Sequence, residues 1–565
     1  MNFREKMTGR DIAGVLLFGI SLLMLGKSLT LCFSNDIWYD ELFTVGLIGH
    51  SYGELVRFTA ADVHPPLYYC IVKLWVELCK LIVPEAETVM LAKLASVLPY
   101  VILMVYSATL VRRRFGALAA GLFPFCILAM PQLSAYTVEV RMYGWAMLFV
   151  TAAFLHAWEL ILCYGNDKTA CGEHGKSPSE EEDCGGRGAA ERSGGGLCHA
   201  AALVLYGLAA AYTQYFACVA VGMVYFGVLI VLIRYKRRKI RTWLLCAALS
   251  AVGYVPWLAT LAGQLHAVRE NYWILPLTWR SLGGCVKFLM KPAFANDVLS
   301  TVWAVALTCG CGAAVLYVML AGGKGKLCNK MTEKDKLCYN SRVLGTEMQR
   351  REKAEFAAAG VGVLAGLTAF GFAASFLFRP VFVYRYMIPA AGCFWLSVAV
   401  SIDELCKLKR RSVGVLLLAL LIPAGMRDYR AFMGEEEYKI VCMKETQTAL
   451  SQIGPGDSVL YNFDQVQAVT GYYLPETVER FLWRTEGETL IQEITSSCAL
   501  LEETEEIEQL LSAARREKGE RNIWFIGSFN SRDDIVAQWR DAGFTVEEQG
   551  NFLLERYWFN LYKIS

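Results

Sequence analysis

Two acidic motifs near the N-terminal end of the chain contain residue types that could carry chemistry. Asp40 and Glu41 follow two aromatic residues, and Asp62 and His64 precede a Pro-Pro break. A carboxylate shielded by aromatic side chains can act as a general base, because shielding from water raises its pKa. Asp62 and His64 could hold a divalent metal ion or orient a substrate. Plainer alternatives are a solvated loop or a helix cap for the acids, and local packing for His64.

Two more polar clusters lie further along the chain. Their candidate residues are Glu139, Arg141, Tyr143, Arg379, Tyr384 and Arg385. In an extended turn Glu139 and Arg141 would face the same way, with Glu139 holding Arg141 toward an anion. The planar guanidinium groups of Arg379 and Arg385 suit phosphate oxygens. A surface ion pair and arginines that snorkel at a membrane interface are the alternatives.

The composition indicates a membrane protein. Of the 565 residues, 55% are hydrophobic and only 19% are charged, which is too apolar for a typical soluble protein. Residues 427–565 hold 14 Lys/Arg against 25 Asp/Glu, a net charge of −11, so residues 1–426 carry +13. This asymmetry separates a basic membrane domain (1–426) from an acidic tail domain (427–565).

The positions of Lys and Arg predict the topology, because basic loops stay in the cytoplasm. Arg4, Lys6 and Arg10 precede the apolar run 12–33, so this segment should run outward, and Arg112–Arg114 should lie inside. The stretch 66–83 carries charges at helical spacing on one face, which is typical of a helix lying in the membrane interface. We therefore expect an outer loop over 34–89 with interfacial helices, and an inward crossing over 90–111.

The remaining apolar segments alternate consistently and bring the number of crossings to about eleven. They are 12–33, 90–111, 115–133, 142–164, 199–214, 216–233, 243–262, 299–321, 356–376, 387–402 and 413–426. Polar or basic loops at 165–198, 236–239 and 322–355 fall inside, and 165–198 has a composition typical of disorder. The N-terminus is then cytoplasmic, the tail extracytoplasmic, and all four polar clusters lie on the outer face of the plasma membrane.

The acidic tail has the pattern of a small α/β domain. Strand-like runs occur at 458–461 and 523–526, with acidic helical sequence at 499–518 between them. The stretch 544–564 predicts two strands joined by a turn at Gly550 and Asn551. The tail shows no nucleotide-binding loop or metal signature, and no nucleic-acid partner is expected.

Taken together, the motifs resemble those of the GT-C glycosyltransferases, specifically the protein O-mannosyltransferase-like group of family 39. The matching segments are Trp38–Glu41, Asp62–Tyr69, Glu139–Tyr143 and Tyr384–Pro389, and they occur in the family's order. No segment resembles the β-trefoil domain of the eukaryotic mannosyltransferases, which argues against protein mannosylation. The resemblance implies the GT-C fold, a polyprenyl-phosphate sugar donor, an acceptor outside the cytoplasm and inversion by direct displacement.

The resemblance also implies roles for individual residues. Asp40 would remove the proton of the acceptor hydroxyl, and Glu41 would assist or orient it. Asp62 and His64 would shape the site near the donor head group, and Arg141 and Arg385 would be candidates for the carrier phosphate.

Three functions are compatible with these observations. The favoured one is a hexosyl- or pentosyltransferase that glycosylates a cell-envelope glycan, lipid or protein. A transporter or flippase for lipid-linked sugars is the alternative, but it needs polar residues at mid-membrane depth, whereas the predicted clusters lie at one face. A third is a non-catalytic assembly protein that docks through its tail.

Overall fold

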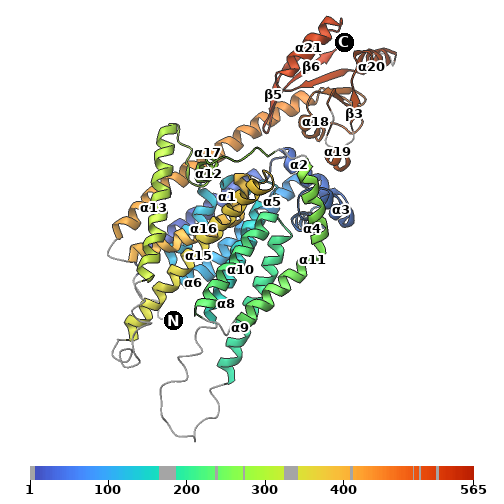
Figure 1. Cartoon of the computed structure of the whole chain (residues 1–565). Coiled ribbons are helices and arrows are strands. Elements are labelled where there is room, and N and C mark those ends of the chain that lie inside the picture. Colours follow the sequence, from blue (N-terminus) through green and yellow to red (C-terminus); the bar gives the residue numbers. More distant parts are fainter. Residues whose placement is uncertain are drawn as a thin grey trace.

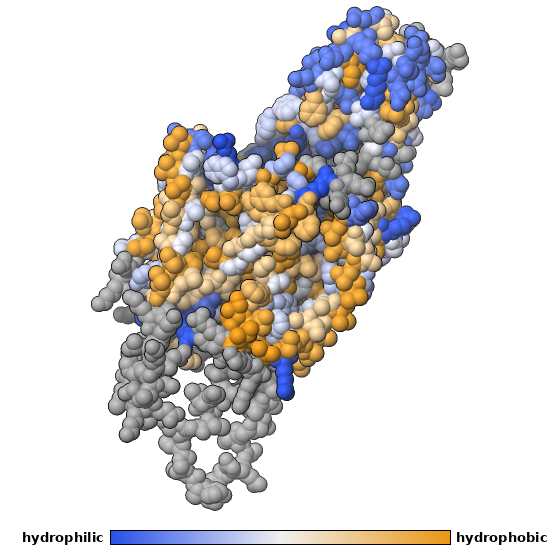
Figure 2. All heavy atoms as spheres, viewed as in Figure 1, coloured by the Kyte–Doolittle hydropathy of each residue, from blue (hydrophilic) through white to orange (hydrophobic). Residues whose placement is uncertain are grey.

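Figure 1 shows the computed structural model, which describes residues 7–163, 186–235, 240–270, 274–323, 341–407, 411–485, 487, 489–495, 498–516 and 521–565. Long helices form a bundle, and a smaller α/β part lies at one end of it. Hydrophobic residues cover most of the visible bundle surface, whereas the α/β part is largely hydrophilic (Figure 2). This distribution is typical of membrane-spanning helices joined to a water-exposed domain.

Nine helices among the described residues are long and apolar enough to cross a membrane. They are α1 (Gly9–Leu31), α5 (Thr88–Tyr106) with its continuation through η1 (Ser107–Val111) and α6 (Arg112–Phe115), α8 (Tyr143–Cys163), α10 (Tyr215–Tyr235), α11 (Ile240–Glu270), α13 (Asp297–Gly323), α15 (Ser341–Leu377), α16 (Ile388–Lys407) and α17 (Arg411–Leu450). The chain is therefore a multi-pass membrane protein.

Two shorter apolar helices occupy the other two predicted crossings. In α7 (Ala117–Ala129) all residues but the first are buried, and its Gly121 lies against Gly14 of α1 so closely that a Cβ on either glycine would meet the other helix's backbone. The other short helix belongs to α9 (Gly186–Ala211). Residues 186–198 are thus helical where the sequence predicts a disordered loop. Most of the three predicted inner loops, at 164–185, 236–239 and 324–340, lies outside the described residues.

Three short helices fill the predicted outer loop. They are α2 (Tyr39–Gly49), α3 (Tyr52–Ala61) and α4 (Leu67–Ile82), and none of the three is a candidate membrane span. Ser51 and Glu54 form a capping box that starts α3. On the charged face of α4, Lys73 pairs with Glu77 at 2.9 Å. All three helices lie at the end of the bundle that carries the α/β part (Figure 1), whereas their position relative to lipid stays a prediction.

The basic cluster Arg112–Arg114 lies at the C-terminal end of the continuous span Thr88–Phe115. This end of the bundle is opposite the one that carries the α/β part (Figure 1). The 28 residues of this span correspond to about 40 Å of helix. Lys93 near its start pairs with Asp36, and Arg114 near its end donates to Glu159. Asp40 and Arg113 therefore lie on opposite sides of the bundle, as the predicted topology requires.

The α/β part is built on a mixed six-stranded sheet of order β3-β2-β1-β4-β6-β5. Its strands are β1 (Ser458–Tyr461), β2 (Glu479–Trp483), β3 (Ala499–Leu501), β4 (Ile523–Gly527), β5 (Val546–Leu554) and β6 (Tyr557–Ile564), and its helices are α18 (Asp464–Gly471), α19 (Thr489–Ile494), α20 (Thr504–Arg516) and α21 (Ser531–Asp541). Strands β1 to β4 pair in parallel, and β6 runs antiparallel to β4 and β5. The predicted α/β character is confirmed.

The predicted turn at Gly550 and Asn551 is wrong. Both residues lie inside β5, where the register with β6 shifts between Glu548 and Gly550. Gly550 has a φ of 149°, which suits an irregularity within the strand rather than its end. The chain turns instead at Glu555 and Arg556, and Glu555 adopts a left-handed φ of 56°.

The last helix joins the two parts without a break. The crossing predicted over 413–426 belongs to α17, whose 40 residues continue to Leu450. At its far end Thr446 Oγ1 donates to the carbonyl of Leu553 in β5 at 2.9 Å. The division at residue 427, proposed from charge, thus falls inside a helix that contacts both parts.

Candidate functional site

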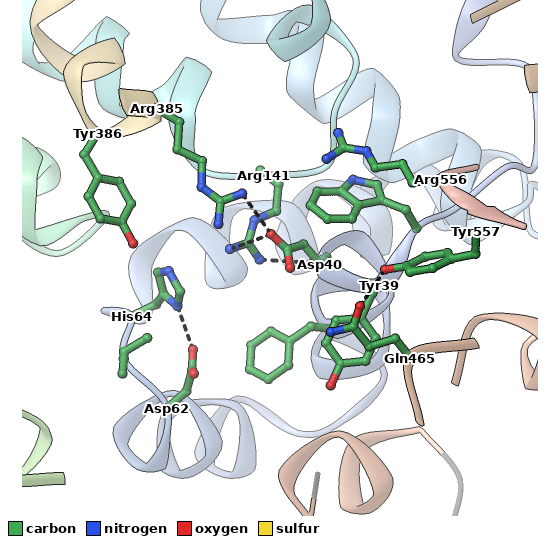
Figure 3. Close-up of a pocket in the computed structure, with 13 residues that line it drawn as sticks. Tyr39, Asp40, Asp62, His64, Arg141, Arg385, Tyr386, Gln465, Arg556 and Tyr557 are labelled. Atoms are coloured by element: carbon green, nitrogen blue, oxygen red, sulfur yellow. Dashed lines mark hydrogen bonds and ion pairs between the residues drawn. The ribbon is translucent and has the colours of Figure 1, made fainter. Parts of the chain in front are cut away.

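A pocket of about 400 Å³ opens where the helix bundle meets the α/β part (Figure 3). Its lining residues are Trp38, Tyr39, Asp40, Phe43, Asp62, Val63, His64, Arg141, Arg385, Tyr386, Gln465, Arg556 and Tyr557. They come from the start of α2, the loop after α3, the loop before α8, η6 (Tyr384–Met387), α18 and the β5–β6 turn. Both ends of the chain therefore contribute to one site.

Asp40 lies between two arginines in this pocket. Its Oδ2 is 3.3 Å from Nη1 of Arg385 and 3.7 Å from Nη2 of Arg141, whose Nη1 also donates to the Asp40 carbonyl at 3.0 Å. Burial acts to lower the pKa of Arg141, but the charge of Asp40 contributes to raising it above its ordinary value, so Arg141 stays protonated. The three side chains, drawn in Figure 3, form a small charged network.

The charges that line the pocket favour an anion. Arg141, Arg385 and Arg556 provide three guanidinium groups, against the two carboxylates of Asp40 and Asp62. A net positive, partly enclosed site attracts anionic groups, and arginine forks bind phosphate oxygens with good geometry.

Glu41 faces away from this pocket and positions its neighbours. Its carboxylate accepts hydrogen bonds from the N–H groups of Trp38 (3.2 Å) and Val140 (2.8 Å). Thr44 Oγ1 donates to the carbonyl of Val140 at 3.1 Å, so two side chains of α2 are hydrogen-bonded to the loop that carries Arg141. Burial raises the pKa of Glu41 to about 7. The expected orienting role is thus compatible with this geometry.

Asp62 and His64 lie together in the same pocket, with His64 Nδ1 2.7 Å from Asp62 Oδ2. Burial acts to raise the pKa of Asp62, but the charge and the hydrogen bond of His64 outweigh it, so the pKa is lowered. Among the described residues, no group of three or more His, Cys, Asp or Glu side chains could hold a metal ion. An ion bound by Asp62 and His64 alone would need substrate oxygens to complete its shell.

Glu139 and Arg141 do not face the same way, contrary to the prediction from an extended turn. Arg141 lines the pocket of Asp40, whereas Glu139 lines a second cavity. The backbone is bent here, because the N–H of Arg141 donates to the carbonyl of Glu139 at 2.7 Å. The period-two alternation of an extended strand therefore does not apply.

Three other predicted residues do not line the pocket. Tyr143 is buried, and the guanidinium of Arg385 lies 5.9 Å from its ring centre. Tyr384 packs beside Phe288 of α12 (Ser281–Met290). Arg379 lies in the segment between α15 and η6 and is not a lining residue.

Sequence reasoning missed the contribution of the tail. Arg556 lies 3.9 Å from the ring centre of Trp38, and Tyr557 donates to Gln465 Oε1 at 3.0 Å. In Figure 3, Asp40 lies between the Asp62–His64 pair and these tail residues. The only indication in the sequence is that Arg556 directly follows Glu555 near the end of the chain. That pattern does not predict a pocket residue unless the fold is known.

No protein-family model matches the chain, and no curated protein matches it either. Among solved structures it is similar to ArnT from Cupriavidus metallidurans in the apo state, with 12% identity, a TM-score of 0.52 and 97% of each chain covered. ArnT bound to undecaprenyl phosphate matches with 14% identity, a TM-score of 0.51 and the same coverage. The oligosaccharyltransferase AglB from Archaeoglobus fulgidus, in complex with an inhibitory peptide and a dolichol-phosphate, has 10% identity and a TM-score of 0.40, covering 91% of this chain and 69% of that one.

The likeness to ArnT spans nearly the full length of both proteins. The chain has the GT-C fold. This confirms the fold implied by the sequence motifs. At this level of identity the likeness concerns the fold alone, so the chemistry must be argued from the pocket.

Proposed function

We propose that this GT-C protein is a glycosyltransferase that moves a sugar from a polyprenyl-phosphate donor to an acceptor outside the cytoplasm. The observation that carries the proposal is the carboxylate of Asp40 held between Arg141 and Arg385 in a positively charged pocket. ArnT, whose fold this chain shares, has been solved with undecaprenyl phosphate bound. A polyprenyl chain would lie against the apolar helices while its phosphate reaches the arginines.

Arg385 is the first candidate for the donor phosphate. Its side chain is 23% exposed, whereas that of Arg141 is 5% exposed and also holds the Asp40 backbone. A phosphate that takes Arg385 would compete with Asp40 for it and leave Asp40 with Arg141 alone.

The proposed transfer assigns a role to each of these side chains. Asp40 accepts the proton of the acceptor hydroxyl as its oxygen attacks the anomeric carbon. The bond from that carbon to the phosphate oxygen breaks, and the electron pair leaves with the polyprenyl phosphate, whose charge Arg385 and Arg556 stabilise. One direct displacement inverts the anomeric centre. Asp62 and His64 would contact the sugar from the other side of the pocket.

The distribution of basic residues supports an extracytoplasmic pocket. The cluster Arg112–Arg114 belongs to α6, at the end of the bundle opposite α2, the helix that carries Asp40 (Figure 1). Lys407, which pairs with Asp403, belongs to the same basic side, because Lys407 Nζ also donates to the carbonyl of Phe115. Positive residues favour the cytoplasmic side. The N-terminus would then be cytoplasmic and the α/β part extracytoplasmic.

The test is Asp40→Asn, with Asp534→Asn on the exposed face of α21 as the matched control. Glycan mass analysis of cells that lack the chain identifies the missing sugar, and complementation with each variant follows. We expect Asp534→Asn to restore the product and Asp40→Asn to reduce transfer by about 10²- to 10⁴-fold. Full restoration by a folded Asp40→Asn variant would remove Asp40 from the chemistry. Donor translocation by purified protein in vesicles, without a transfer product, would favour a flippase.

A further inference from the structure

A second cavity of about 400 Å³ adjoins the pocket of Asp40. It is bounded by α17, the β5–β6 turn, the loop around η2 (Ser134–Thr137) and the start of α5. Trp38 and Arg556 line both spaces, so this stacked pair forms their common wall. The volume is that of a small-molecule site.

Acidic residues outnumber basic ones in the lining of this cavity, whereas arginines outnumber carboxylates in the first pocket. Its acidic lining residues are Asp36, Glu41, Glu139, Asp428, Glu435, Glu436 and Glu555, and its basic ones are Lys93, Lys439 and Arg556. The net charge is negative when the acids are ionised. In that state the excess of carboxylates favours a cationic group.

Most of these acids are engaged within the protein. Asp36 pairs with Lys93 at 2.7 Å, and Lys439 pairs with Glu436 at 2.6 Å and with Glu555 at 3.6 Å. Glu41 accepts its two backbone hydrogen bonds. Lys439 also lies 3.8 Å from Glu435, so these contacts account for both lysines and leave Glu139 and Asp428 without an ion pair in the described part of the chain.

Glu139 and Asp428 keep free acceptor oxygens. Glu139 is 9% exposed, and its carboxylate makes no hydrogen bond or ion pair with the described part of the chain. Asp428 accepts from the N–H of Ala293 through Oδ1 at 2.9 Å, while its buried Oδ2 has no protein partner. A buried acceptor without a partner is costly, and a bound donor would remove that cost.

We infer that this cavity binds a primary ammonium group on a sugar of the acceptor, through Glu139 and Asp428. The inference rests on the proposed glycosyltransferase function. An ammonium group carries three N–H donors and one charge, so one or two carboxylates are enough to bind it. A metal ion fits less well, because no group of three ligands converges among the described residues.

The wall formed by Trp38 and Arg556 is the place where this cavity could open into the pocket of Asp40. Arg556 is exposed and sits on a two-residue turn, so its side chain can move without disturbing the core. If it swings off Trp38, the two spaces join. An acceptor anchored by its amine in the second cavity could then present a hydroxyl to Asp40.

The inference predicts selective binding that needs no donor. Purified full-length protein in detergent is titrated with glucosamine and with glucose, which differ in the charged amine. We expect glucosamine to bind about tenfold more tightly than glucose. Glu139→Gln and Asp428→Asn should each remove most of that preference. Glu437→Gln, the same change on an exposed residue of α17 outside the cavity, should leave it unchanged.

Three results would overturn the inference. They are equal binding of the two sugars by the wild-type protein, a preference unchanged in both cavity variants, or binding of Mg²⁺ that the same variants abolish. Circular dichroism shows whether each variant is folded, and having two variants keeps the test valid if one is not. Since the titration contains no donor, its outcome is separate from the Asp40→Asn transfer test.

Discussion

The guanidinium of Arg556 lies 3.9 Å from the centre of the Trp38 ring. Trp38 is the N-cap residue of α2, two positions before Asp40. A residue at the tip of the β5–β6 hairpin thus contacts the segment that presents the central carboxylate. The α/β part therefore completes the pocket rather than merely standing beside it.

Arg556→Ala should lower transfer without unfolding the protein. The side chain is exposed, so its loss should change the free energy of unfolding by less than about 1 kcal/mol. Loss of a charged contact to phosphate costs about 1.5–3 kcal/mol, or roughly 10- to 100-fold in kcat/KM. Steady-state kinetics with the isolated donor measures this. We expect the kcat/KM of Arg556→Lys to lie between those of the wild type and Arg556→Ala. Unchanged kinetics in Arg556→Ala would show that Arg556 does not contact the donor.

Arg141→Lys tests the guanidinium fork beside Asp40. Arg141 contacts both the carboxylate and the carbonyl of Asp40, and one ammonium group cannot reproduce both contacts in the same plane. We expect kcat to fall about tenfold or more, with a smaller change in KM. A lysine variant with normal kcat would mean that charge alone is sufficient at this position.

Glu41→Gln should alter the pH dependence of stability. Burial raises the folded-state pKa of Glu41 to about 7, above an unfolded value of about 4.3. The native state then binds a proton that the unfolded state releases. The stabilising contribution of this proton to the free energy of unfolding is therefore complete below about pH 4 and is lost as pH rises through 7. Relative to the variant, the melting temperature of the wild type should fall between about pH 4 and pH 7. Parallel melting curves would contradict this assignment.

Lys93→Met should destabilise the junction between α5 and the segment before α2. Lys93 and Asp36 pair at 2.7 Å with side chains only 4% and 5% exposed. Removing one partner leaves a buried charge and costs about 3–5 kcal/mol, whereas the double variant with Asp36→Asn should recover part of it. Lys27→Met is the control, because its pair with Glu437 is 55% and 60% exposed and should contribute less than about 1 kcal/mol. Chemical unfolding in detergent measures all four proteins.

The local part of the site could be predicted from the sequence. Asp40 and the Asp62–His64 pair lie in short motifs whose caps and prolines fix the nearby backbone, and basic clusters predict which end of the bundle they share. The structure brings these residues together with Arg141 and Arg385 in one pocket. Membrane helices are also readily predicted, because length and hydrophobicity are strong signals.

The rest depends on long-range packing. The side chains of Glu139 and Arg141 point into different cavities because the loop between them is bent. The N–H of Val140 in this loop donates to Glu41, and no local sequence pattern predicts that hydrogen bond. The hairpin tip was misplaced because a glycine inside a strand looks like a turn. Arg556 could not be linked to Trp38 before the hairpin was placed against the bundle.

The uninterrupted helix α17 makes the geometry of the pocket sensitive to the register of the chain. Its 40 residues span about 60 Å, and each residue turns the helix by about 100°. Adding or deleting a single residue between the bundle and Thr446 would rotate the sheet about the helix axis and carry the hairpin tip away from Trp38. Substitutions along the exposed faces of α17 should be tolerated far better than any change in its length.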